Sequence, residues 1–267
     1  MLSITRRGAT TLALLVALFS GACISAARAD DPPADPYEPW ARVLAKFVNA
    51  RGEIDFHALA RERTDLDDFL AYVARVSPNT NPASFASRDA KLAYYINAYN
   101  AIAMFNVIDA GFPRRLSGFT KLKFFAFKLF AVGGERISLY TFENDVIRPL
   151  GDERVHFALN CMATGCPRLP QVPFRAGDLD QQLDAETRRF FGEQRNLQIE
   201  PERKLVRVSS LLEFYTDDFL ARAPTLIAYI NRYAGTPVPA GYDVEFIDYD
   251  WTVNDQHRET GSSAPDA

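Results

Sequence analysis

The chain has 267 residues, 48% of them hydrophobic, and a formal net charge of −4. This length suffices for one large domain or two small ones with a core that needs no disulfides for stability. Three cysteines exclude a cysteine-rich scaffold. An acidic chain without a basic block gives no reason to expect nucleic acid or an anionic membrane as a partner.

The first 29 residues have the pattern of a secretory signal peptide. Arg6 and Arg7 precede a short apolar run, and a small-residue cleavage site ends at Ala29. We therefore expect cleavage after Ala29 and a periplasmic or secreted protein. Two alternatives are a lipoprotein anchor at Cys23 and a twin-arginine signal at the arginine pair.

Removal of residues 1–29 would leave a more acidic chain. The segment holds three arginines and no acidic residue, so the formal charge would change from −4 to −7. No later stretch approaches the ~20 apolar residues that a spanning helix needs. We therefore expect the mature protein not to span a membrane.

The rest of the chain divides into three predicted parts. Residues 30–39 hold four prolines and are predicted to form an irregular leader. Residues 40–254 have the patterning of a single domain, and the polar residues 255–267 are predicted to be a disordered tail. The expected organisation is therefore one domain that follows a signal peptide and a leader.

The most apolar predicted helix covers residues 87–110, with Gly111 as its stop. Asn97 and Asn100 interrupt its apolar surface three residues apart, on one face. Buried amides must be hydrogen-bonded, so the pair either anchors a neighbouring loop or orients a catalytic group.

Two predicted hairpins flank the centre of the chain. An aromatic run over 119–130 ends at Gly133-Gly134 and resumes as a short strand, and a second pair of strands surrounds Pro201 to Arg203. Residues 244–253 resemble a closing strand. Helices outnumber strands and strict βαβ alternation is absent, so we predict a helix-rich α+β domain.

Residues 154–160 alternate apolar and polar side chains with the period of a strand. This predicts a strand in the small sheet, with His156 and Asn160 on one face. A loop follows directly and carries Cys161 and Cys166. Most of the reactive side chains of the chain therefore gather in this segment.

Several short motifs occur in a characteristic order along the chain. They are residues 95–100, Phe142-Glu143, residues 156–161, Cys166-Pro167, Phe214-Tyr215, Asp218-Phe219 and residues 248–251. Together they resemble the family known as domain of unknown function 547, over most of the region from Leu92 to Trp251. The resemblance implies a single α+β domain, as in exported bacterial proteins, and no assigned function. The chain departs from the family at Asn144, where a histidine is common.

The central loop suggests a thiol enzyme as the first hypothesis. Cys161 would be the nucleophile of a hydrolase or acyl-transferase, and His156 would lower its pKa and return a proton to the leaving group. Asn97, Asn100 or Asn160 would hold the imidazole ring. The ligand would be an unidentified small molecule or peptide.

Two other hypotheses use the same loop. In the first, Cys161 and Cys166 form a disulfide that staples a noncatalytic binding or scaffold module. In the second, His156 and both cysteines bind a metal, with Glu143 or water as the fourth ligand; zinc suits such ligands. The two five-residue spacings do not match the usual cysteine knuckle, so no cofactor is expected.

Overall fold

Helix α4 (Arg88–Asp109) is the longest and most buried helix of the computed structural model, which describes residues 35–258. Ser87 caps its first turn by accepting a hydrogen bond from Ala90 N, and 15 of its 22 residues are buried. A helix covered on nearly all sides lies inside the core, as the sequence predicts. The predicted signal peptide, residues 1–29, lies outside the described residues.

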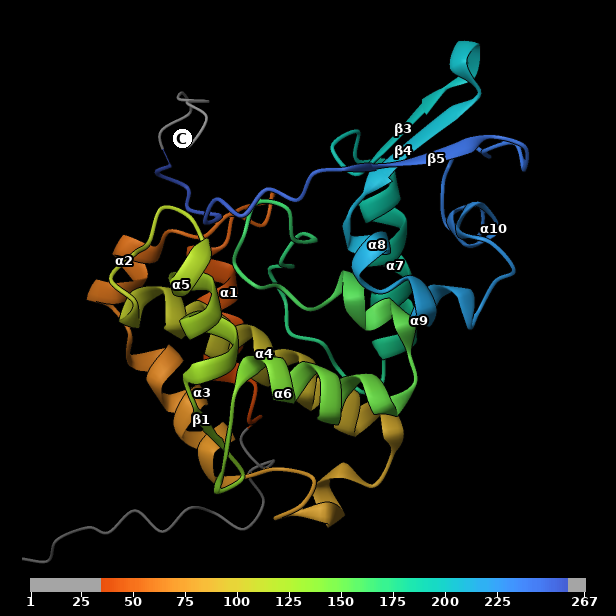
Figure 1. Cartoon of the computed structure of the whole chain (residues 1–267). Coiled ribbons are helices and arrows are strands. Elements are labelled where there is room, and N and C mark those ends of the chain that lie inside the picture. Colours follow the sequence, from red (N-terminus) through yellow and green to blue (C-terminus); the bar gives the residue numbers. More distant parts are fainter. Residues whose placement is uncertain (1–34, 259–267) are drawn as a thin grey trace, which may run out of the picture. The chain divides into compact units, whose positions relative to one another are not determined.

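The other helical segments surround α4 or follow it in the chain (Figure 1). The α-helices are α1 (Glu38–Phe47), α2 (Phe56–Arg61), α3 (Thr64–Arg75), α5 (Gly118–Leu122), α6 (Leu139–Thr141), α7 (Leu179–Gly192), α8 (Leu211–Phe214), α9 (Thr216–Leu220) and α10 (Leu226–Ile230). Short 3₁₀ helices are η1 (Pro82–Phe85), η4 (Arg148–Leu150), η5 (Glu153–Phe157) and η6 (Pro201–Arg203). Two π-helices, η2 (Lys123–Phe127) and η3 (Phe142–Ile147), continue α5 and α6.

Two small sheets confirm the helix-rich α+β class. Strands β1 (Phe130–Val132) and β2 (Glu135–Ile137) form an antiparallel hairpin, whose turn residues Gly133 and Gly134 both have positive φ. Strands β3 (Leu197–Glu200) and β4 (Leu205–Ser209) form the second predicted hairpin, and β5 (Asp243–Ile247) pairs with β4 in parallel. The predicted closing strand is therefore real but ends at Ile247.

The prediction of a strand over 154–160 is wrong. Residues Glu153–Phe157 form the 3₁₀ helix η5, and no described strand pairs with this segment. Val155 packs into the apolar cluster around α4, whereas Phe157 packs into a second cluster built by α7, the three-stranded sheet and α8–α10. The alternating pattern thus reflects a segment that lies between two cores, and not the two faces of a sheet.

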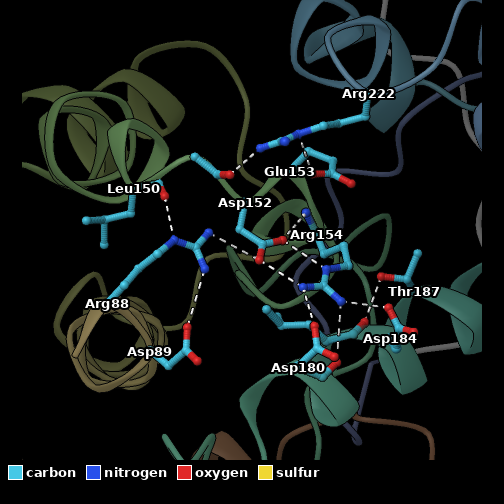
Figure 2. A network of polar contacts seen from close by, with 12 residues as sticks. Arg88, Asp89, Leu150, Asp152, Glu153, Arg154, Asp180, Asp184, Thr187 and Arg222 are labelled. Carbon is cyan, nitrogen blue, oxygen red and sulfur yellow. Dashed lines mark hydrogen bonds and ion pairs between the residues drawn. The ribbon is translucent and has the colours of Figure 1, made fainter.

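Arg154 joins elements from both cores through ion pairs with three aspartates, of which Asp152 is buried (Figure 2). Its guanidinium contacts Asp152 at 2.9 Å, Asp180 at 2.8 Å and Asp184 at 2.7 Å. Arg88, at the start of α4, also reaches Asp152, at 3.3 Å. Hydrogen bonding to Asp152 raises the pKa of Arg154 despite partial burial. The network ties α4, α7 and η5 together.

The last described residues return to the N-terminal half. Isolated bridges join Asp255 to Ile54 and Val253 to Ala163, and the Gln256 side chain donates to Phe47 O. The first residues of the predicted tail therefore make contacts, and 259–267 lie outside the described residues. Within 35–258, the helices are too short or too polar to cross a membrane.

We predict that Arg154→Leu lowers the free energy of unfolding by about 3 kcal/mol, because it takes one of two cationic partners within residues 35–258 from the buried Asp152 and leaves Arg88. Chemical denaturation measures the change. Arg42→Leu, which removes exposed ion pairs with Glu38 and Asp65, is the control and should lower the free energy of unfolding much less. Equal effects of the two substitutions would contradict the assigned role of Arg154.

Candidate functional site

Two asparagines hold both ends of the thiol loop, residues 160–167. Asn100 accepts a hydrogen bond from Asn160 N at 2.8 Å and donates to Ala158 O at 2.9 Å. The Asn160 side chain accepts from Met162 N and donates to Pro167 O. Asn100 therefore anchors a loop on α4, one of the two uses that the sequence suggests for the buried amides.

Asn97 makes a different connection. Its side chain accepts a hydrogen bond from Trp40 Nε1 and from Phe174 N, and it donates to Phe174 O. These contacts join α4 to α1 and to the segment before α7. Asn97 and Asn100 share a helix face, but they anchor different segments, and their hydrogen bonds do not orient His156.

The two thiols of the loop lie against each other. Cys161 Sγ and Cys166 Sγ are 2.6 Å apart, and Cys161 N donates to Cys166 Sγ at 3.0 Å. The Tyr249 hydroxyl lies 3.2 Å from Cys166 Sγ and 3.5 Å from Cys161 Sγ. Both cysteines are free, with Cys166 buried and Cys161 partly exposed. The turn thus brings together the pair that the sequence selects.

Hydrogen bonding divides the two thiols into a donor and an acceptor. Burial alone would raise the pKa of Cys166, but hydrogen bonds from Cys161 and Tyr249 more than offset it and lower this pKa. The hydrogen bond to Cys166, together with burial, raises the pKa of Cys161. When the pair loses its first proton, the thiolate is therefore Cys166 and the remaining proton stays on Cys161; the thiolate is the nucleophilic form.

Glu143 forms a second polar cluster near the loop. It is buried and accepts hydrogen bonds from the hydroxyls of Tyr99, at 3.0 Å, and Tyr215. Burial and the negative charge of Glu143 raise the pKa of both tyrosines, and the negative charge of a Cys161 thiolate would raise them further. These phenols therefore stay protonated and act as hydrogen-bond donors.

His156 belongs to a third group, on the other side of Tyr215. Its ring stacks on Tyr215 with centroids 3.7 Å apart, and its Nε2 lies 2.8 Å from Asp218 Oδ2. Arg148 binds both Asp218 oxygens, at 2.8 and 2.9 Å. Hydrogen bonding by His156 lowers the pKa of Asp218, Arg148 lowers it further, and burial opposes both effects.

The structure brings the two cysteines together, but not the expected thiol–imidazole pair. Among residues 35–258, the recorded hydrogen bond of His156 runs to Asp218, and its buried Nδ1 has no partner. The sulfur of Cys161 instead contacts Cys166 and Tyr249. The physical reason is that η5 directs His156 toward α9, whereas the loop directs Cys161 toward the segment after β5.

The predicted metal ligands also lie in separate groups. Within the described part of the chain, no three His, Cys, Asp or Glu side chains gather in a way that could hold a metal ion. His156 binds Asp218, and Glu143 binds two tyrosines. The geometry therefore gives no support to a site made of His156, Glu143 and the cysteines.

Comparison with known families assigns one segment that contains α4, Glu143, His156 and both cysteines. Residues 83–191 match the family model described as Protein of unknown function, DUF547. This segment is less than half of the chain. Comparisons with curated proteins and with solved structures found no match.

Three residues of the site lie after the DUF547 segment and were not predicted as site residues. Tyr215 and Asp218 come from α8–α9, and Tyr249 follows β5. They lie in the motifs Phe214-Tyr215, Asp218-Phe219 and 248–251, which the sequence resemblance includes. Those motifs were a usable signal, but their sequence separation from the cysteines hid the contacts.

Gly165 allows Tyr249 to approach the thiol loop of the DUF547 segment. A Cβ at this position would lie 2.9 Å from both Asp250 N and the Tyr249 ring. We predict that Gly165→Ala lowers the free energy of unfolding by about 1 to 3 kcal/mol, because backbone must move. Gly177→Ala, where nothing lies within 4 Å, is the control. Denaturation midpoints that fall equally in both variants would contradict this account.

The Tyr249 hydroxyl should also stabilise the thiolate. We predict that Tyr249→Phe raises the pKa of the first thiol to ionise, because a hydrogen bond to the charged sulfur is lost. Less thiolate is then present at a given pH, so the alkylation-rate profile of reduced protein shifts to higher pH. The exposed Tyr140→Phe should leave the profile unchanged. An unshifted Tyr249→Phe profile would disprove the assignment.

Proposed function

We propose that this domain performs thiol–disulfide exchange at Cys161 and Cys166. The observation that carries the proposal is the distance of 2.6 Å between the two sulfurs, with the Tyr249 hydroxyl beside both. A disulfide bond is about 2.05 Å long, and contact between the two sulfurs is the arrangement from which such a bond closes. The loop is therefore arranged to close and open one bond.

The exchange follows from the protonation of the pair. The Cys166 thiolate attacks one sulfur of a substrate disulfide, which breaks that S–S bond and expels one substrate thiolate. The expelled thiolate takes the proton of Cys161. The Cys161 thiolate then attacks Cys166 Sγ, expels the second substrate thiolate and closes the Cys161–Cys166 bond. Two electrons pass from the cysteines to the substrate.

A hydrolase or acyl-transferase with Cys161 as nucleophile and His156 as base has less support. Such a mechanism needs the imidazole within hydrogen-bond reach of the sulfur. His156 instead pairs with Asp218, and the Cys161 sulfur contacts Cys166 and Tyr249. Exchange chemistry needs no base beyond the pair itself.

We also propose that the protein is exported to the periplasm or secreted. The arginine pair, apolar run and small-residue site of residues 1–29 support export. An oxidising compartment permits a cysteine pair to cycle between thiol and disulfide forms. Intact-mass measurement of protein from the cell envelope should find a chain that begins at Asp30, and a chain that retains Met1 would contradict export.

We predict a reduction potential between about −270 and −120 mV for the cysteine pair, the range of exchange-active dithiols. Equilibration in glutathione buffers, followed by alkylation and mass measurement, gives this value. A potential below about −300 mV would contradict exchange and indicate a structural staple in a noncatalytic module. Cys161→Ser and Cys166→Ser are the controls, because neither variant can close the intramolecular bond.

A further inference from the structure

An arginine-rich cavity of about 390 Å³ lies beside the thiol loop. Thr164, Cys166 and Pro167 of the loop contribute to its wall. The arginines that line it are Arg51, Arg168, Arg189, Arg195 and Arg258. Its volume is within the range of small-molecule sites, roughly 300 to 1,000 Å³. A small ligand in the cavity would therefore lie next to Cys166.

Positive charge exceeds negative charge around this cavity. Glu53 is shared by Arg51 and Arg258, and Glu193 is shared by Arg189 and Arg195. The fifth arginine, Arg168, pairs with Glu186. Five guanidinium groups thus meet three carboxylates, although the whole chain has a net charge of −4. The cavity is a locally cationic site on an acidic protein.

Two contacts connect the cavity wall to the thiol loop. Arg195 donates hydrogen bonds to Thr164 O and, at 3.2 Å, to Cys166 O. The wall therefore carries an excess of positive charge directly beside the backbone of Thr164 and Cys166.

We propose that the cavity binds the substrate of the exchange reaction, and that this substrate is a small-molecule disulfide that carries carboxylate groups. This inference rests on the proposed thiol–disulfide exchange. Guanidinium groups recognise carboxylates through paired hydrogen bonds, and an excess of two positive charges suits a ligand with two negative ones. A disulfide bound in the cavity lies beside Cys166, and the Cys166 thiolate attacks one of its sulfurs in the exchange reaction.

Reduced full-length protein should distinguish disulfides by charge. The probes are glutathione disulfide, which is anionic, bis(2-hydroxyethyl) disulfide, which is neutral, and cystamine, which is cationic. Each rate constant for loss of protein thiols is divided by that of 2-mercaptoethanol with the same probe. We expect the normalised rate for glutathione disulfide to exceed the neutral one at least tenfold at low salt, and cystamine to be slowest. Added NaCl should reduce these differences.

Arginine variants test whether the cavity causes this selectivity. Arg51→Gln combined with Arg189→Gln removes two cavity charges whose recorded hydrogen bonds do not involve the thiol loop. We expect the double variant to lose about tenfold in rate with glutathione disulfide and to keep its rate with the neutral probe. Arg203→Gln, at an exposed arginine of the second hairpin, is the matched control and should behave as wild type.

The outcomes separate this inference from the function on which it rests. Equal normalised rates for the three probes, or a double variant that reacts as wild type, would overturn the cavity as substrate site and leave exchange intact. If the double variant loses as much rate with the neutral probe as with glutathione disulfide, the cavity is also overturned as the substrate site. The arginines would then stabilise the thiol loop and not bind the ligand. Failure of all three probes to oxidise the pair would instead refute exchange itself.

Discussion

The geometry of the thiol pair depends on four hydrogen bonds made by Asn100 and Asn160. Buried backbone groups need partners, and a short loop cannot supply them through regular secondary structure. Asn100 supplies a donor and an acceptor from α4, and Asn160 supplies the same to the loop itself. Because α4 is the most buried helix, the position of Cys161 against Cys166 is fixed by the core.

A second constraint keeps the thiols and the histidine apart. The Tyr215 ring covers His156, while its hydroxyl donates to Glu143. Arg148 forms an ion pair with Asp218, which lies beside the imidazole of His156. Partly buried charges need such a partner. His156 thus belongs to a paired network that orders α9 against η3–η5. The dithiol is left with Tyr249 as its polar neighbour, which favours chemistry between two sulfurs.

The sequence pattern of a single segment was enough to predict those helices and hairpins whose residues are contiguous in the chain. The apolar residues of 87–110 and the turn at Gly133-Gly134 predicted α4 and the first hairpin correctly. The alternation of apolar and polar residues over 154–160 wrongly predicted a strand, because the pattern does not reveal that Val155 and Phe157 enter different cores. Residue type and spacing identified the two cysteines as candidate site residues. They did not identify Tyr249 as a neighbour of Cys166, because the two residues are 83 positions apart in the sequence.

The central claim is that a thiolate at Cys166 attacks and that Cys161 resolves the product. Trapping tests it directly, with reduced Cys161→Ser and Cys166→Ser variants and bis(2-hydroxyethyl) disulfide as the neutral probe. Mass mapping should find a stable mixed disulfide on Cys166 in the first variant, formed faster than any adduct on Cys161 in the second. Wild type should yield only the Cys161–Cys166 bond. Faster adduct formation at Cys161, or no adduct at either cysteine, would contradict the account.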